Sequence, residues 1–193
     1  MNICIYGASS NRLDPVYYEA AEQLGRCIAA SGDVLVFGGG ADGLMGACAR
    51  GAKARGGKIL GIAPKFFDEP GFLLSDCDEF IMTSTMAERK EQMLCLSDAF
   101  IALPGGIGTM DEFFETITLK QLGLAKGPLV LLNTAGFYDP LVTFLDRMAG
   151  GGFMSEACLG LVHLCATPED AVDAARLPEE ARGSIRRLED YTG

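Results

Sequence analysis

The stretch Ala102–Glu115, which reads ALPGGIGTMDEFFE, decides the fold. The apolar run 99–103 enters a turn that is dense in glycine, and the turn opens directly into a pattern typical of a helix starting near Thr109. Glycines without a Cβ let backbone N–H groups approach a ligand closely, and a helix start adds unpaired donors and the positive end of a dipole. We therefore predict a strand, a loop that can hold a phosphate, and a helix that carries Glu112 one turn from its start.

The same stretch has a second interpretation. The segment Thr109–Glu112 also fits a capping box, in which a threonine caps the helix and a glutamate three residues later reaches back to the cap. Capping boxes are far commoner than active sites, so this short pattern alone favours the cap. The choice between a capping role and a functional role for Glu112 therefore depends on the other motifs of the chain.

Apolar runs alternate with helix-length patterns along the whole chain. The predicted strands lie at 3–6, 34–37, 59–62, 79–82, 99–103, 129–132 and 161–164. The predicted helices lie at 15–30, 43–55, 84–96, 110–122, 138–148 and 168–175. Such alternation is typical of a parallel sheet covered on both faces. We predict a doubly wound, Rossmann-like α/β fold that forms one nucleotide-binding domain over residues 1–193, with a charged tail from about Leu177.

Composition narrows the class of protein. The chain has 193 residues and a formal net charge of −10, which argues against a nucleic-acid binder. No apolar run approaches the length of a membrane span, so we expect no transmembrane helix. The chain enters its first predicted strand without a charged n-region, a long apolar region and a cleavage site, so we expect no signal peptide. The single histidine, His163, lies in an apolar run, where we expect a core position rather than a catalytic one. One histidine cannot build a metal cluster, so we expect no metal site.

The cysteines point to a compartment. Seven of them are scattered without C-x-x-C pairs, and several fall in apolar segments, namely Cys4, Cys27, Cys95 and Cys165. This pattern favours buried free thiols in a reducing cytoplasm over a disulfide framework or a zinc site.

Two further motifs follow predicted strands. The loop Gly38–Gly46 contains G-x-G-x-x-G, but the next strand ends at Pro64 without the acid that would hold a ribose, so a nicotinamide or flavin site is weakly supported. A tight turn explains this loop about as well as contact with a nucleotide. The segment Met86–Met93 places Arg89 and Lys90 beside the inward stripe of a helix. A buried guanidinium is costly unless an anion or a carboxylate meets it.

The two carboxylates of the predicted helix 110–122 support the same idea. Glu112 and Glu115 share one helix face, where they repel each other unless a cation lies between them, and Arg89 is the obvious candidate. The chain has no G-x-x-x-x-G-K-[ST] and no G-x-S-x-G, which excludes a P-loop enzyme and a serine nucleophile elbow.

Together these motifs resemble a known family. The segment Pro104–Glu112 matches the P-G-G-x-G-T-x-x-E signature of the Lonely Guy family, the cytokinin riboside 5′-monophosphate phosphoribohydrolases that are often mislabelled lysine decarboxylases. The segment Met86–Lys90 resembles the family's M-x-x-R-K, and Phe37–Gly46 resembles a third block. The blocks stand in family order, so the resemblance covers nearly the whole chain.

The resemblance implies hydrolysis of the N-glycosidic bond of an adenosine 5′-monophosphate, with N6-prenylated forms preferred, and it requires no cofactor. A carboxylate that stabilises oxocarbenium character suits this chemistry, and we assign that role to Glu112. Arg89 would hold the phosphate or ribose and position Glu112, with Lys90 in support. The remaining expected substrate-binding residues are Gly105, Gly106, Gly108 and Thr109 at the phosphate, and Asp111 and Thr118 at the ribose and base.

Two other functions remain open at this level. A carrier or sensor would hold a nucleotide or a pterin-type phosphate without turnover, and the glycine loops alone do not exclude it. The joint presence of Arg89 and Glu112 does argue against it, and the missing ribose acid argues against a nicotinamide oxidoreductase. Apolar residues spread around the helix at Phe113, Phe114, Ile117 and Leu122, so we expect it to be buried on nearly all sides, by its own sheet or by a partner subunit. The family resemblance implies the partner subunit, in a homodimer.

Overall fold

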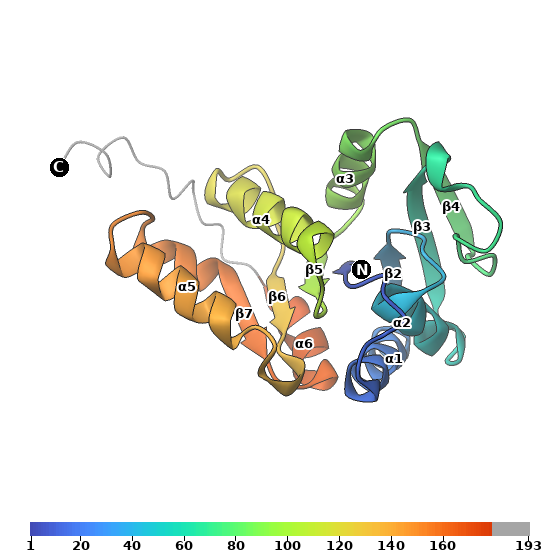
Figure 1. The fold of residues 1–193 in the computed structure, drawn as a ribbon, viewed down its shortest axis with the longest axis horizontal. Helices are drawn as coiled ribbons and strands as arrows, with labels where there is room; N and C mark the ends of the chain where they lie inside the picture. Colours follow the sequence, from blue (N-terminus) through green and yellow to red (C-terminus); the bar gives the residue numbers. More distant parts are fainter. Residues whose placement is uncertain (179–193) are drawn as a thin grey trace.

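The computed structural model describes residues 1–178. Within this range one parallel sheet of seven strands has the order β4-β3-β2-β1-β5-β6-β7 (Figure 1). The strands are β1 (Asn2–Tyr6), β2 (Val34–Phe37), β3 (Lys58–Pro64), β4 (Glu79–Thr83), β5 (Ala99–Ala102), β6 (Leu129–Leu132) and β7 (Val162–Cys165). The prediction of a doubly wound α/β fold is confirmed.

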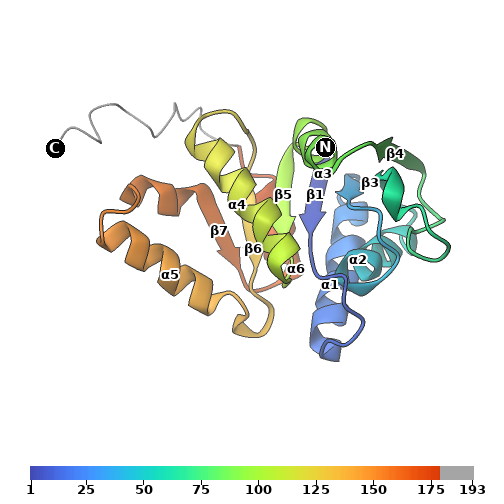
Figure 2. The same ribbon diagram turned by 45° about the horizontal axis from the view of Figure 1, so that its top comes forward.

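The helices cover both faces of the sheet. They are α1 (Pro15–Ala30), α2 (Gly43–Lys53), α3 (Met86–Cys95), α4 (Ile107–Gln121), α5 (Asp139–Gly150) and α6 (Pro168–Ala175). Three short 3-10 turns lie at η1 (Lys65–Phe67), η2 (Thr134–Gly136) and η3 (Glu156–Leu161). Figures 1 and 2 show α3 and α4 on one side of the sheet and α1 and α2 on the other. None of the helices in residues 1–178 combines the length and the apolarity that a membrane crossing needs.

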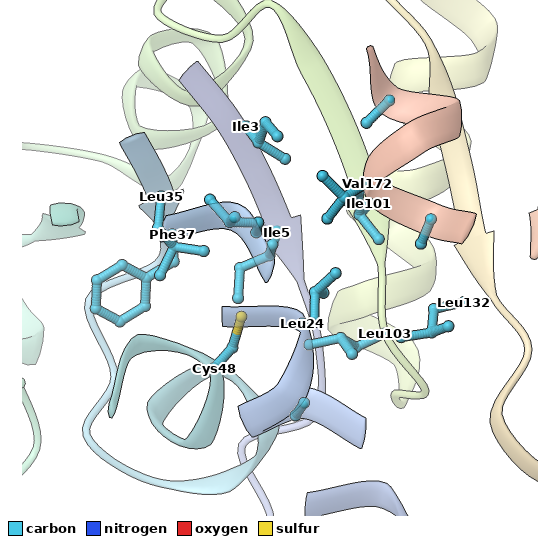
Figure 3. Packing of buried hydrophobic residues seen from close by; sticks show 14 of the residues in the cluster. Ile3, Ile5, Leu24, Leu35, Phe37, Cys48, Ile101, Leu103, Leu132 and Val172 are labelled. Carbon is cyan, nitrogen blue, oxygen red and sulfur yellow. The ribbon is translucent and has the colours of Figure 1, made fainter. Parts of the chain in front are cut away.

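The alternation of side chains along each strand produces two cores. In β1, Ile3 and Ile5 point toward α1, α2 and α6, whereas Cys4 and Tyr6 point toward α3 and α4. Figure 3 shows the first of these cores, where Leu24 of α1 packs against strand residues. Because both faces are covered, the central strands are apolar at nearly every position, which is why the sequence shows runs rather than alternation.

The strand order changes direction between β1 and β5. The chain builds outward from β1 through β2 and β3 to β4, then returns to pair β5 with the other side of β1. In open parallel sheets the loops after two such strands separate and leave a crevice, where ligands bind. The glycine-rich loop 103–106 follows β5, so the topology places it at this crevice.

Several local expectations are corrected by the structure. Helix α4 begins at Ile107, and Thr109 lies inside its first turn rather than capping it, because extended Gly106 is the N-cap and no side chain caps the helix. His163 is only half-buried, since β7 is an edge strand with one neighbour. Cys27 is half-buried and Cys95 is exposed, whereas Cys4 and Cys165 are buried as expected. The charged tail from about Leu177 falls almost entirely outside the described residues.

Candidate active site

A pocket of about 310 Å³ opens where the loops after β1 and β5 separate. Its lining residues come from five regions of the chain: Gly7, Ala8, Ser9, Met45, Phe67, Met86, Arg89, Gly106, Ile107, Gly108, Thr109, Asp111 and Glu112. The start of α4 supplies six of them, all within the stretch Ala102–Glu115 in which the sequence places the predicted phosphate loop and Glu112.

The N-terminus of α4 offers backbone donors to the pocket. The N–H groups of Ile107, Gly108 and Thr109 belong to the first turn, which has no intrahelical acceptor for them, and the positive end of the helix dipole lies in the same place. A Cβ added to Gly106 or Gly108 would meet no atom within 4 Å, so both glycines face open space. An anion can therefore approach this backbone closely.

Arg89 and Glu112 form a buried ion pair at the bottom of the pocket. Arg89 Nη1 donates to Glu112 Oε1 at 2.6 Å, and only 5% of the Arg89 surface and 8% of the Glu112 surface remain exposed. Arg89 Nε also donates to the carbonyl oxygen of Ile62, at 3.2 Å. The glutamate does not reach back to cap its helix, so the capping-box interpretation of Glu112 is wrong.

The capping box of this region lies instead at the start of α3. Thr85 Oγ1 accepts a bond from the Glu88 N–H at 3.0 Å, and Glu88 Oε2 accepts one from the Ser84 N–H at 2.6 Å. This reciprocal cap fixes where α3 begins. It thereby fixes the register that turns Arg89, one turn later, toward the pocket.

Burial sets the protonation chemistry of Glu112. Loss of hydration raises the pKa of the Glu112 carboxyl above its ordinary value, and the Arg89 guanidinium opposes that rise. The Glu112 carboxylate is thus a stronger base than that of an exposed glutamate. The hydrogen bond from Arg89 also holds it in one orientation. Both properties suit a general base.

The body of α4 is anchored to the sheet beneath Glu112. Thr116 Oγ1 donates to the Glu112 carbonyl oxygen at 2.8 Å and lies 3.0 Å from the hydroxyl of Tyr6 on β1. All three groups are buried. The position of the catalytic candidate on the helix is therefore tied to the central strand.

Lys90 occupies a different place from the one expected. Its ammonium lies 3.1 Å from Asp111 Oδ2 and 3.1 Å from Glu115 Oε2, and it does not line the pocket. Lys90 therefore links α3 to α4. It is also Lys90, and not Arg89, that lies against Glu115, because Arg89 is one residue earlier and turns inward.

Two other expected residues lie outside the pocket as well. Gly105 packs against Thr109, whose Oγ1 would be 2.0 Å from an added Cβ, so this glycine closes the turn. Thr118 lies six residues beyond Glu112 and hence on another face of α4, where its hydroxyl donates to the Phe114 carbonyl oxygen. It lines a second hollow of about 510 Å³ together with Lys90, Ile107, Met110, Asp111, Phe114, Glu115 and Leu119.

Several residues that line the pocket were not among the expected site residues. Gly7, Ala8 and Ser9 follow β1, and the position of a loop after the first strand of a doubly wound sheet was a usable signal. Met45, Phe67 and Met86 form the apolar side of the pocket. The loop Gly38–Gly46 contributes only the Met45 side chain, since Gly43 and Gly46 pack against backbone oxygens of Ala8 and Ala41.

The fold and this pocket define a class of protein: a doubly wound α/β protein with an anion-binding helix start beside a buried carboxylate. Residues 45–175 match the family model described as possible lysine decarboxylase. A probable cytokinin riboside 5′-monophosphate phosphoribohydrolase of Oryza sativa subsp. japonica is 37% identical, over 98% of this chain and 79% of its own. The chain belongs to this family, the Lonely Guy family.

The chain is also similar to a bacterial hydrolase and to a solved carrier protein. The cytokinin riboside 5′-monophosphate phosphoribohydrolase of Rhodococcoides fascians is 42% identical over 84% of this chain and 82% of its own. Among solved structures, the molybdenum cofactor carrier protein of Chlamydomonas reinhardtii superposes with a TM-score of 0.68 at 28% identity, covering 90% of this chain and 94% of that one. The same fold thus serves proteins named as hydrolases and proteins named as carriers.

Proposed function

We propose that this protein hydrolyses the N-glycosidic bond of adenosine 5′-monophosphates, preferring N6-prenylated forms, and releases the free base and ribose 5-phosphate. The observation that carries the proposal is the buried Arg89–Glu112 pair beside the open start of α4. The names of the relatives from Oryza and Rhodococcoides support the same substrate class. A carrier has no need of a buried carboxylate next to its anion site.

The 5′-phosphate would bind at the N-terminus of α4. The backbone N–H groups of Ile107 to Thr109 are unpaired donors of the first turn at the pocket, and Gly106 and Gly108 leave the approach to them open. The chain has a net charge of −10, so this local positive end has to hold the anion against the overall field. The same net charge argues against nucleic acid as a partner.

Glu112 would carry the chemistry. As the bond between the ribose C1′ and the base nitrogen breaks, the electron pair leaves with the base and positive charge develops on the ribose, which a carboxylate stabilises. Water adds its oxygen to C1′ while one of its protons passes to Glu112 and from there to the departing base. This step needs neither a metal ion nor an organic cofactor.

Arg89 and Asp111 would complete the polar side of the pocket. The guanidinium holds the Glu112 carboxylate and would offer its charge to the phosphate or ribose, and Asp111, which also lines the pocket, would face the ribose. The apolar side chains of Met45, Phe67 and Met86 suit an adenine ring and an N6-alkyl group.

We further propose that the protein is a homodimer. Ile107 is 91% exposed and lines one hollow together with the exposed Phe114, and Leu124 in the loop after α4 is 72% exposed, so apolar side chains are exposed at both ends of this helix. A second copy on these side chains would cover the hollow that Thr118 lines and bring Thr118 toward the base of a bound nucleotide. None of the seven cysteines, all of which lie in the described part of the chain, forms a disulfide, and this favours the cytoplasm as the place of action.

The direct test is product analysis. Purified protein is incubated with adenosine 5′-monophosphate and with its N6-isopentenyl derivative, and free base and ribose 5-phosphate are quantified by chromatography, with unphosphorylated adenosine as the control. We expect both products in equal amounts, fastest from the prenylated nucleotide and barely from adenosine. Recovery of tightly bound but intact nucleotide would instead identify a carrier.

A further inference from the structure

Three consecutive glycines follow β2, and the structure gives each a different environment. A Cβ on Gly38 would lie 2.1 Å from Arg89 Nη2. Gly39 has a φ of 77°, and a Cβ there would meet the Phe80 ring at 2.4 Å. Gly40 has open surroundings, with Met45 Cε at 3.7 Å as the nearest atom. Only the first of the three touches the ion pair of the site.

The contacts of Arg89 show what surrounds its guanidinium. Nη1 binds Glu112, Nε binds the carbonyl oxygen of Ile62 at the end of β3, and Nη2 lies against the bare backbone of Gly38. The three contacts come from α4, β3 and the loop after β2. Arg89 is 95% buried. Hydrogen bonds hold its guanidinium on two of these sides, and on the third side the backbone of Gly38 holds it by shape alone.

We propose that Gly38 is a positioning residue: its missing side chain forms the notch that keeps the Arg89 guanidinium aligned with Glu112. This inference rests on the proposed function for its effect on catalysis, but the notch itself is a structural claim. It assigns the first glycine of the Gly38–Gly46 loop to the alignment of an ion pair, where the sequence pattern had suggested a nucleotide loop or a simple turn.

The expected consequence of a side chain at this position follows from the geometry. Gly38 does not have the left-handed backbone that only glycine tolerates, so alanine fits its conformation. The atom that blocks the new methyl group is the far end of a long side chain, which can swing away. The Gly38→Ala protein should therefore fold, with its guanidinium displaced and the bond to Glu112 broken or stretched.

The first measurement compares Gly38→Ala with Gly40→Ala, which adds the same methyl group two residues away in open space. We expect kcat/KM with adenosine 5′-monophosphate to fall about 100-fold for Gly38→Ala, as for other displacements of about 1 Å at a reacting centre. Gly40→Ala should stay within about twofold of the wild type. Equal losses in the two variants, or no loss in Gly38→Ala, would overturn the proposal.

The pH profile adds a readout that general damage would not move. Displacing Arg89 removes the charge that opposes the effect of burial on Glu112, so the acidic limb of kcat should move to higher pH in Gly38→Ala but not in Gly40→Ala. The other titratable groups around Glu112 are Lys90 on α3, Asp111 on α4, and Cys4 and Tyr6 on β1. These groups are the same in both variants.

A double-mutant cycle tests the notch without any enzyme assay. Thermal unfolding is measured for the wild type, Gly38→Ala, Arg89→Ala and the double variant. Gly38→Ala should lower the midpoint in the wild type and leave it unchanged in the Arg89→Ala background, where no guanidinium fills the notch. An equal loss in both backgrounds would contradict the inference. If the wild type showed no hydrolysis, the proposed function would fail while this cycle still decided the role of Gly38.

Discussion

At the scale of single residues, the site depends on how a buried guanidinium is satisfied. Arg89 is almost fully buried, and its guanidinium contacts one carboxylate, one carbonyl oxygen and the backbone of Gly38 at the lining of the pocket. Taking either charge of such a pair away leaves the other uncompensated in a dry environment, at a cost of about 3–5 kcal/mol. The pair therefore stabilises the site only as a unit.

Substitution of Arg89 should separate its roles. We expect Arg89→Ala to reduce hydrolysis below about 1% and to weaken binding of the nucleoside monophosphate far more than binding of the free base. Arg89→Lys should recover little, because an ammonium cannot reproduce the planar fork that reaches Ile62 and Glu112 together. Calorimetric titration with both ligands checks this. Equal weakening for the phosphorylated and unphosphorylated ligand would indicate an ion pair with a purely structural role.

The pKa of Glu112 gives a pH dependence. An exposed glutamate has a pKa of about 4.3, and burial raises the pKa of Glu112 above its ordinary value. The carboxylate form that the proposed catalysis needs is therefore lost at a higher pH than in an exposed glutamate. The rate at saturating substrate should therefore be full at high pH and fall as pH drops through the raised value. The acidic limb of the profile is measured as kcat between about pH 4 and 8, roughly the range in which carboxyl groups with a raised pKa titrate. An acidic limb at or below the ordinary glutamate value would contradict the assignment.

At the scale of elements, the start of α4 allows a separate test of the proposed phosphate binding. Ile107 is the first residue of the helix, its side chain is 91% exposed, and the preceding Gly106 is extended. Proline is well tolerated at this helix position and demands an extended residue before it, but it has no N–H. The position therefore allows one backbone donor to be deleted without breaking the helix.

We expect Ile107→Pro to weaken binding of adenosine 5′-monophosphate about 10- to 100-fold, the range for loss of one hydrogen bond to a charged group. Binding of adenosine should change little. Ile107→Ala, which keeps the N–H, is the matched control for the lost side chain. Titrations of both variants with both ligands decide the matter. If the proline variant bound the nucleotide as well as the alanine variant did, the phosphate would have to lie elsewhere.

The elements themselves were largely predictable from the sequence, and the reasons are physical. Buried parallel strands must be apolar throughout, so runs such as 129–132 stand out, and α1 carries a cap and a proline at its start. The predicted helix 110–122 starts three residues later than α4 does, because the N-cap of α4 is a glycine that makes no side-chain hydrogen bond. The cap at Thr85 and Glu88, which orients Arg89, was not predicted, because Thr109–Glu112 has the same spacing of threonine and glutamate.

At the scale of the whole molecule, the pocket depends on contacts that no local pattern encodes. The strand order brings Ala8 and Ser9 after β1 next to Gly106 after β5, although about a hundred residues separate them. Phe67 enters from the irregular connection after β3. The pairing of Arg89 with Glu112 was foreseeable because a buried charge needs a partner, whereas the diversion of Lys90 to Asp111 and Glu115 depends on how α3 and α4 cross.

The dimer proposal is tested at this same scale. Phe114→Glu places a charge in the proposed interface, whereas Phe144→Glu places one at an exposed phenylalanine on α5. We expect light scattering to give twice the 20.5 kDa chain mass for the wild type and Phe144→Glu, and the single-chain mass with reduced activity for Phe114→Glu. A fully active wild-type protein with the mass of one chain would contradict a shared site.

The central claim is that the Glu112 carboxylate performs the hydrolysis, and Glu112→Gln tests it most directly. Turnover and nucleotide affinity are measured on the same preparation, with the unfolding midpoint as the check on folding. Because the carboxylate acts on charge that appears only in the transition state, we expect kcat to fall by about 100-fold or more while the affinity for adenosine 5′-monophosphate changes little. A Glu112→Gln protein that hydrolyses the nucleotide at nearly the wild-type rate would contradict the account.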